Sequence, residues 1–116
     1  MSDDALAFLF AKDQDLFNRW DAGQRLASNI ILKSIETVDE DDTATLPAAF
    51  LDAYAEILSD TGLDRAFTAS ALTLPGEQDI AQRMPIVDVD AIHKVREKAR
   101  QQIGLTFEQN WRKLYN

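Results

Sequence analysis

The sequence has 116 residues, 46% of them hydrophobic and 28% charged, proportions typical of one soluble globular domain. It has 12 lysines and arginines and 20 aspartates and glutamates. The resulting net charge of -8 argues against binding to nucleic acid. Cysteine is absent, which excludes disulfides and cysteine zinc ligands and suits a cytoplasmic protein, and no apolar run approaches the ~20 residues of a membrane span.

The first half of the chain has helical periodicity. An apolar run at residues 5–11 predicts a short helix, and either Asp13 or Asp15 can cap the helix that follows. Apolar or small residues then recur at steps of three or four, which predicts one buried stripe along a long helix. The stripe comprises Leu16, Trp20, Gly23, Ala27, Ile30, Ile31 and Val38. Clustered acidic residues at 36–42 predict a loop after it.

A third helix is expected to begin near Thr45, a capping residue, with Pro47 in its first turn. Gly62 is expected to end this helix in a conformation with positive φ. The apolar stripe between these limits consists of Phe50, Leu51, Tyr54, Ile57 and Leu58. These residues predict one amphipathic helix that packs against the long one.

Three further helical segments are predicted in the second half. Asp64 can cap a short helix that Pro75 and Gly76 end, and residues 77–83 suggest one or two more turns. Asp88 or Asp90 can start a last long helix, whose stripe is Ile92, Val95, Ala99, Ile103, Phe107, Trp111 and Leu114. Gly104 is a position where this helix can bend or break.

The predicted fold class is all-α, because no segment alternates apolar and polar residues long enough to form a strand. We expect five or six helices that form an irregular bundle or the first layers of an α-solenoid superhelix. From His93 onward the sequence has six basic residues and two acidic ones. This pattern is more typical of a solvated helix face than of a docking surface for an acidic neighbour.

The residue types limit the chemistry. His93 is the single histidine, so the chain cannot provide both imidazoles of an H-E-x-x-H zinc site, and we expect His93 to be an ordinary polar side chain. No serine lies in a G-x-S-x-G turn, and the calcium-loop spacing that starts at Asp13 lacks the required glycine and glutamate. We therefore assign no catalytic, cofactor-binding or metal-binding residue.

One long motif carries a family resemblance. The string Asp13-Gln-Asp-Leu-Phe-Asn-Arg-Trp-Asp-Ala-Gly-Gln24 resembles the D-x-D-x-F-N-R-W-[DE]-A-[AG]-Q stretch of bacterial aminopeptidase N. The resemblance continues, in order, with Phe50-Leu-Asp-Ala53, Leu72-Thr-Leu-Pro75, Ile86-Val-Asp-Val-Asp-Ala-Ile-His-Lys-Val-Arg-Glu97 and residues 111–115. The sequence departs from the pattern at Val89, where related sequences often have proline.

This resemblance implies that residues 1–116 are the opening part of the C-terminal helical domain of a longer zinc aminopeptidase. In that family a separate, upstream catalytic domain holds the zinc and the peptide substrate, and the helical domain forms a superhelix over the active-site cleft. The implied partners are the other domains of the parent enzyme. Phe17 and Trp20 would then anchor the long helix in the core, while Arg19 and Gln24 would bond backbone or carboxylate groups across a helix or domain boundary.

Two other functions stay open at this stage. The chain can be an independent helical interaction module, or, with little support, an enzyme that uses the carboxylates of Asp88 and Asp90. A segment removed from neighbouring domains would expose apolar faces, so we also expect self-association into a homo-oligomer.

Overall fold

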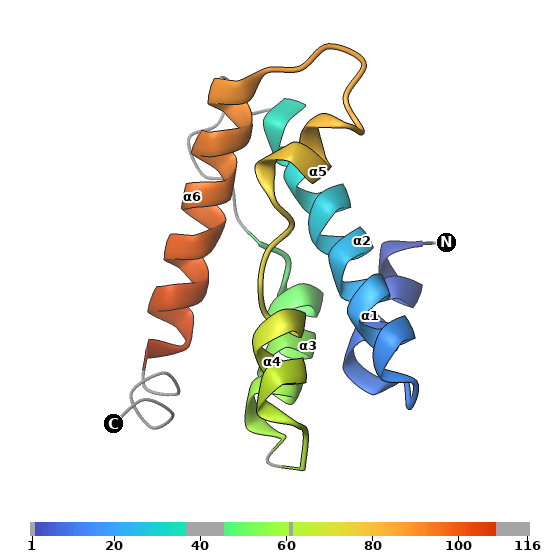
Figure 1. The fold of residues 1–116 in the computed structure, drawn as a ribbon. Coiled ribbons are helices and arrows are strands. Elements are labelled where there is room, and N and C mark those ends of the chain that lie inside the picture. Colours follow the sequence, from blue (N-terminus) through green and yellow to red (C-terminus); the bar gives the residue numbers. More distant parts are fainter. Residues whose placement is uncertain (1, 37–45, 61, 109–116) are drawn as a thin grey trace.

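The computed structural model describes residues 2–36, 46–60 and 62–108, and these residues form helices joined by short connections (Figure 1). The helices are α1 (Asp3–Lys12), α2 (Leu16–Glu36), α3 (Ala48–Ser59), α4 (Arg65–Ala71), α5 (Glu77–Ala81) and α6 (Val89–Thr106). The described ranges contain six helices and no strand, which confirms the predicted all-α class.

Helix α1 begins two residues earlier than its apolar run. The side chain of Ser2 accepts a hydrogen bond from the Ala5 amide at 3.2 Å, which satisfies one of the unpaired N–H groups of the first turn. Asp3 and Asp4 follow in that turn, where negative charge is favoured by the helix dipole. The acidic start of the chain therefore forms part of the helix.

Helix α2 has its predicted length but a different buried face. Leu16 is 44% exposed and Trp20 is only partly buried, so the expected stripe is wrong at its start. The buried residues are Arg19, Ala22, Gly23, Leu26, Ala27, Ser28, Ile30 and Ile31. Val38 and the predicted loop beyond Glu36 lie outside the described residues.

The glycine in this face sets how closely α1 and α2 approach. A Cβ atom at Gly23 would lie 2.5 Å from two ring carbons of Phe10, which is itself 1% exposed. Real side-chain carbons do not come so close to one another, so only glycine allows the Phe10 ring to pack directly on the α2 backbone.

The boundaries of α3 differ from those predicted. Pro47 precedes the first turn as the N-cap residue, with φ -62° and ψ 150°, and Thr45 lies outside the described residues. The role assigned to Gly62 is wrong, because α3 already ends at Ser59 and no described glycine has positive φ. Asp60 forms the turn instead, since its carboxylate accepts the Gly62 amide at 2.9 Å.

Aspartates start two of the remaining helices as predicted. Asp64 accepts the Ala66 amide at the start of α4, and Asp88 rather than Asp90 caps α6 by accepting the Ala91 amide at 3.1 Å. Helix α6 continues without a break through Gly104, and its later predicted stripe residues Trp111 and Leu114 lie outside the described residues.

Apolar side chains form two cores. The larger core joins α1, α2, α3, α4 and the second half of α6, and there the rings of Tyr54 and Phe107 stack with centroids 5.1 Å apart. The smaller core lies between the end of α2, α5 and the start of α6 and contains Ile31, Ile80, Ala91, Ile92 and Val95. Helix α6 thus contributes to both cores.

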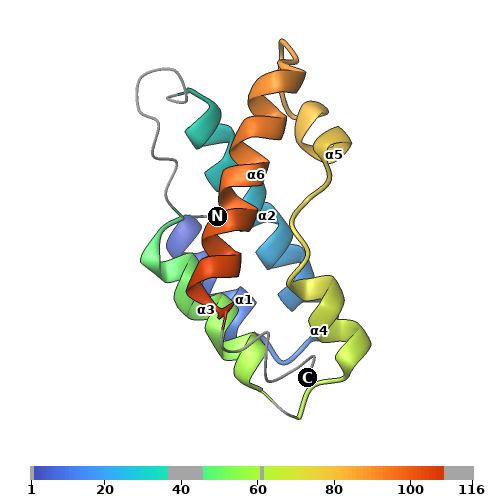
Figure 2. The ribbon, with the colours of Figure 1, turned by 90° about the vertical axis from the view of Figure 1, so that its left-hand side faces the viewer.

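Figures 1 and 2 show α2 and α6 as the two longest helices, with α3 and α4 near one end of the molecule and α5 near the other. A connection of residues 72–76 leads from α4 to α5. We call it the 72–76 segment. Within the described ranges, none of the helices has the length and apolar composition needed to cross a membrane.

Two glycines in helices provide a matched test of this packing. Gly23→Ala should lower the free energy of unfolding by about 1–3 kcal/mol, because the added methyl group overlaps the buried Phe10 ring. Gly104→Ala should raise it by up to about 1 kcal/mol, because alanine favours the helix and a Cβ there meets no atom within 4 Å. Urea denaturation of the two variants measures both effects, and equal shifts of the same sign would contradict the close approach.

Candidate functional site

Two aspartates build the turn between α1 and α2. The Asp13 carboxylate accepts the Asp15 amide at 2.8 Å, and the Asp15 carboxylate accepts the Asn18 amide at 3.1 Å in the first turn of α2. Asp15 is therefore the cap of α2, while Asp13 stabilises the turn and ends α1 through its own amide bonded to the Leu9 carbonyl.

The guanidinium of Arg19 closes the end of α1. Arg19 is only 7% exposed, and its Nε and Nη2 atoms donate to the carbonyl oxygens of Phe10 at 2.8 Å and Ala11 at 2.6 Å. The last carbonyls of a helix have no partner within the helix, and a positive charge at this end is favoured by the helix dipole. The prediction that Arg19 bonds backbone across a helix boundary is confirmed.

The aromatic pair of the motif is less buried than predicted. Phe17 is 69% exposed, so its expected role as a core anchor is wrong, and Trp20 is partly buried beside it with ring centroids 5.9 Å apart. The physical reason is that Arg19 takes the inward position on α2. Phe17 is two residues away, about 200° around the helix, and must therefore point outward.

Gln24 and two other side chains hold the 72–76 segment. The Gln24 side-chain amide, from α2, donates to the Thr73 carbonyl at 2.8 Å, which confirms its predicted backbone bond. The Tyr54 hydroxyl donates to the Leu72 carbonyl at 3.2 Å, and Arg96 Nε donates to the Pro75 carbonyl at 2.7 Å. Three helices thus each provide one donor to carbonyl oxygens of this connection between α4 and α5.

Sequence reasoning treated Tyr54 only as a core residue and assigned no role to Arg96. A signal for both was present in the Leu72-Thr-Leu-Pro75 motif. Proline stops a helix, and the neighbouring leucines are buried, so the carbonyls of this segment need donors from elsewhere. What the motif could not specify was which side chains supply them.

A groove of about 600 Å³ lies beside Trp20 and Gln24, where α2 faces Pro75, Asp79 and Arg83. Two of its polar side chains, Arg83 and Asn29, are bonded to each other. Arg83 donates to the Asn29 side-chain oxygen at 2.7 Å, and the Asn29 amide donates to the Asp3 carboxylate at 3.1 Å. These bonds connect α1, α2 and the residues after α5. This groove therefore links helices through a polar network.

The residues considered for chemistry, Asp88, Asp90 and His93, all lie at the start of α6. The His93 side chain is 64% exposed and lies 3.7 Å from the Glu77 carboxylate, and no group of three or more potential metal ligands occurs there. The Asp88 carboxylate is engaged in capping α6, and Asp90 is exposed on its first turn. A zinc ion does not fit the donors of this part of the chain, and the only histidine of the sequence supplies one imidazole.

Comparison with known proteins places the chain within a longer protein. Aminopeptidase N of Escherichia coli (strain K12) is 31% identical over 115 residues, which cover 99% of this chain and 13% of that protein. Aminopeptidase N of Caulobacter vibrioides is 35% identical over 107 residues, which cover 92% of this chain and 12% of the relative. The chain thus spans about an eighth of the curated relatives it matches.

Solved structures support the same fold. The crystal structure of Legionella pneumophila aminopeptidase A in complex with aspartic acid matches with a TM-score of 0.81 at 22% identity. The match covers 98% of this chain and 13% of that one.

A family model described as a domain of unknown function with ARM repeats (DUF3458_C) matches residues 3–116. ARM repeats are stacked helical units, which agrees with the six helices and the absence of strands in the described ranges. The chain therefore belongs to this ARM-repeat family, and over nearly its whole length it is similar to a helical segment of bacterial aminopeptidase N.

Proposed function

We propose that this chain is the opening, non-catalytic part of the C-terminal helical domain of a cytoplasmic zinc aminopeptidase, and that it helps to cover the active-site cleft. The observation that carries the proposal is the alignment with aminopeptidase N, which covers almost all of the chain and about an eighth of each relative. The remaining length of such a parent is where a catalytic domain would lie.

The residue inventory supports a non-catalytic role. A single histidine and no cysteine are too few ligands for an H-E-x-x-H zinc site, so the zinc of the parent enzyme would be held by other domains. Those domains, and the peptide substrate they bind, are the partners that the proposal implies. Release of N-terminal amino acids from peptides would be an activity of the parent.

The geometry of the motif at residues 13–24 supports an architectural role. Asp15 caps the start of α2, and Arg19 donates hydrogen bonds to the last carbonyls of α1. Gly23 leaves space for the Phe10 ring, and Gln24 donates a hydrogen bond to the 72–76 segment. The polar side chains that make the motif recognisable are thus engaged within the helical assembly. A domain that covers a cleft needs interactions that fix the positions of its helices, since the shape of the domain determines which substrates can enter.

The alternative is an independent helical interaction module, for which the six-helix fold would be sufficient by itself. The two proposals differ in what they predict for a parent enzyme. A module would leave catalysis and substrate choice unchanged when its contacts are altered, whereas a cover would change the size of the peptides that reach the cleft.

Activity measurements test the leading proposal. The isolated chain should not hydrolyse amino-acid 4-nitroanilides with or without added zinc, because it lacks the ligands to hold the ion. In a parent enzyme, loosening the cover with Gln24→Ala should raise the cleavage of long peptides relative to a small anilide. Zinc-dependent turnover by homogeneous isolated chain, or an unchanged ratio in a variant shown to be loosened by hydrogen exchange, would contradict it.

Arg19 provides a second prediction, on stability. Arg19→Lys should lower the free energy of unfolding by about 1–3 kcal/mol, because an ammonium cannot reproduce the two fixed donors that close α1. Arg25→Lys is the matched control on the same helix, since Arg25 is 67% exposed and pairs only with Asp21 among the described residues. Its effect should stay within about 0.5 kcal/mol. Similar losses in urea denaturation of both variants would refute the capping role.

The isolated chain should also self-associate, as a segment without its neighbouring domains. Exposed aliphatic residues gather before and at the start of α6, where Ile86 is 84%, Val87 50% and Val89 63% exposed. Light scattering should show a mass that rises with protein concentration, and Ile86→Lys should reduce the rise. A strictly monomeric protein at high concentration would be inconsistent with this expectation.

A further inference from the structure

A second groove, of about 400 Å³, lies between the 72–76 segment and α6. Its lining includes Tyr54, Leu72, Leu74, Arg96, Arg100 and Ile103. The leucines, the isoleucine and the tyrosine ring offer apolar surface, whereas the two arginines, one turn apart on α6, place guanidinium groups along one side. The groove therefore combines an apolar lining with a cationic edge.

The charge of this lining is unbalanced. None of the described residues that line it is acidic, whereas the groove beside Trp20 includes Asp79 together with Arg25 and Arg83. Arg100 forms an exposed ion pair with Glu97 at 3.0 Å, but Glu97 does not line the groove. In the described part of the chain no carboxylate forms an ion pair with Arg96. A mobile anion would find the positive charge of Arg96 here, beside an Arg100 that is paired with Glu97, even though the whole chain is acidic.

Three backbone carbonyls beside the groove already accept hydrogen bonds from side chains. The carbonyls of Leu72, Thr73 and Pro75 already accept bonds from Tyr54, Gln24 and Arg96. The bond from Arg96 Nε to the Pro75 carbonyl restrains the guanidinium plane, and its two terminal nitrogens form no hydrogen bond to another described residue. Planar pairs of N–H groups match the two oxygens of a carboxylate.

We propose that the groove between the 72–76 segment and α6 binds a carboxylate carried on a short aliphatic group. The carboxylate would accept hydrogen bonds from Arg96 and Arg100, and the aliphatic group would pack against Leu72, Leu74 and Ile103. This site is separate from the proposed role as a cover and stands whether or not that role is correct. It uses residues of this chain alone.

A pair of isosteric probes tests the chemistry of the ligand. Titration of the ¹⁵N-labelled chain with 4-methylpentanoate should shift the amide signals of Leu74 and Gly104 in a saturable manner, while 4-methylpentanamide should not. Raising the ionic strength should weaken binding of the carboxylate, because the attraction involves exposed charges. Equal binding of the acid and the amide, or shifts without saturation, would overturn the proposal.

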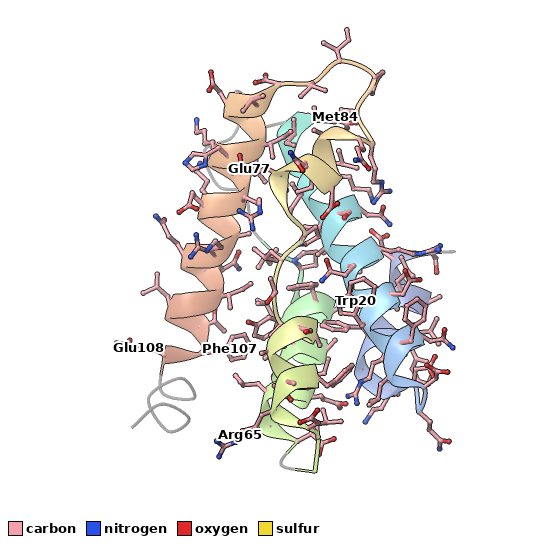
Figure 3. The ribbon with its side chains drawn as sticks, viewed as in Figure 1. Trp20, Arg65, Glu77, Met84, Phe107 and Glu108 are labelled. Atoms are coloured by element: carbon pink, nitrogen blue, oxygen red, sulfur yellow. The ribbon has the colours of Figure 1, made fainter. Side chains whose placement is uncertain are left out.

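Three arginine variants locate the site. Arg100→Gln should weaken binding of 4-methylpentanoate by about fivefold, and Arg96→Gln by about tenfold, as expected for charge-assisted hydrogen bonds. Arg65→Gln is the control, since it changes net charge equally from an exposed position at the start of α4, labelled in Figure 3, and Arg65 does not line the groove. Its affinity should be unchanged.

Arg96 also bonds the Pro75 carbonyl, so Arg96→Gln can disturb the fold. Arg100→Gln then decides the question, because the Arg100 side chain is 62% exposed and its described partner is Glu97, one turn away on the same helix. A folded Arg100→Gln variant with wild-type affinity would overturn the proposal. An equal loss in Arg65→Gln would do so too, because it would show a general effect of charge.

Discussion

The buried guanidinium of Arg19 is the interaction on which the arrangement of the first two helices depends. The last carbonyls of helix α1 have no partner within the helix, and Arg19 reaches back from α2 to two of them, through one buried and one partly buried hydrogen bond. The contact fixes which side of α2 faces α1. Gly23 then lies one turn further along that face, where Phe10 packs against bare backbone. One capped helix end thereby determines the rotation of the longest helix.

The same physical requirement organises the middle of the molecule. The 72–76 segment is largely buried, and the carbonyls of Leu72, Thr73 and Pro75 accept their hydrogen bonds from side chains. Gln24, Tyr54 and Arg96 supply them from three helices, and the segment therefore ties α2, α3 and α6 together. In the described ranges no buried side-chain nitrogen or oxygen atom lacks a partner. Such buried hydrogen bonds favour one arrangement of the helices, because apolar contacts alone would permit several similar arrangements.

These hydrogen bonds offer a physical explanation for the motif that the chain shares with aminopeptidase N. Asp15, Arg19 and Gln24 of the motif close helix ends or bridge helices, which are tasks with strict geometry, whereas Phe17 is exposed. Apolar positions can exchange one aliphatic residue for another at little cost, but a forked donor or a glycine at a close approach cannot be replaced so easily. The chain can therefore share a fold and a short polar signature with its relatives, because both depend on these geometric requirements.

The sequence by itself determined the helical class, the cap at Asp64, the choice of Asp88 or Asp90 as the start of the last helix, and the lack of a second histidine for an H-E-x-x-H site. These depend on local periodicity, local hydrogen bonds and residue counts. It also indicated that Arg19 and Gln24 bond across boundaries. It misplaced Phe17 and Leu16 in the core and Gly62 at a helix end. Only the tertiary structure decided those positions, since the inward face of α2 follows from the α1 carbonyls that Arg19 must reach. The partners of the 72–76 segment were decided in the same way, because residues up to 49 positions apart meet only after the helices have packed.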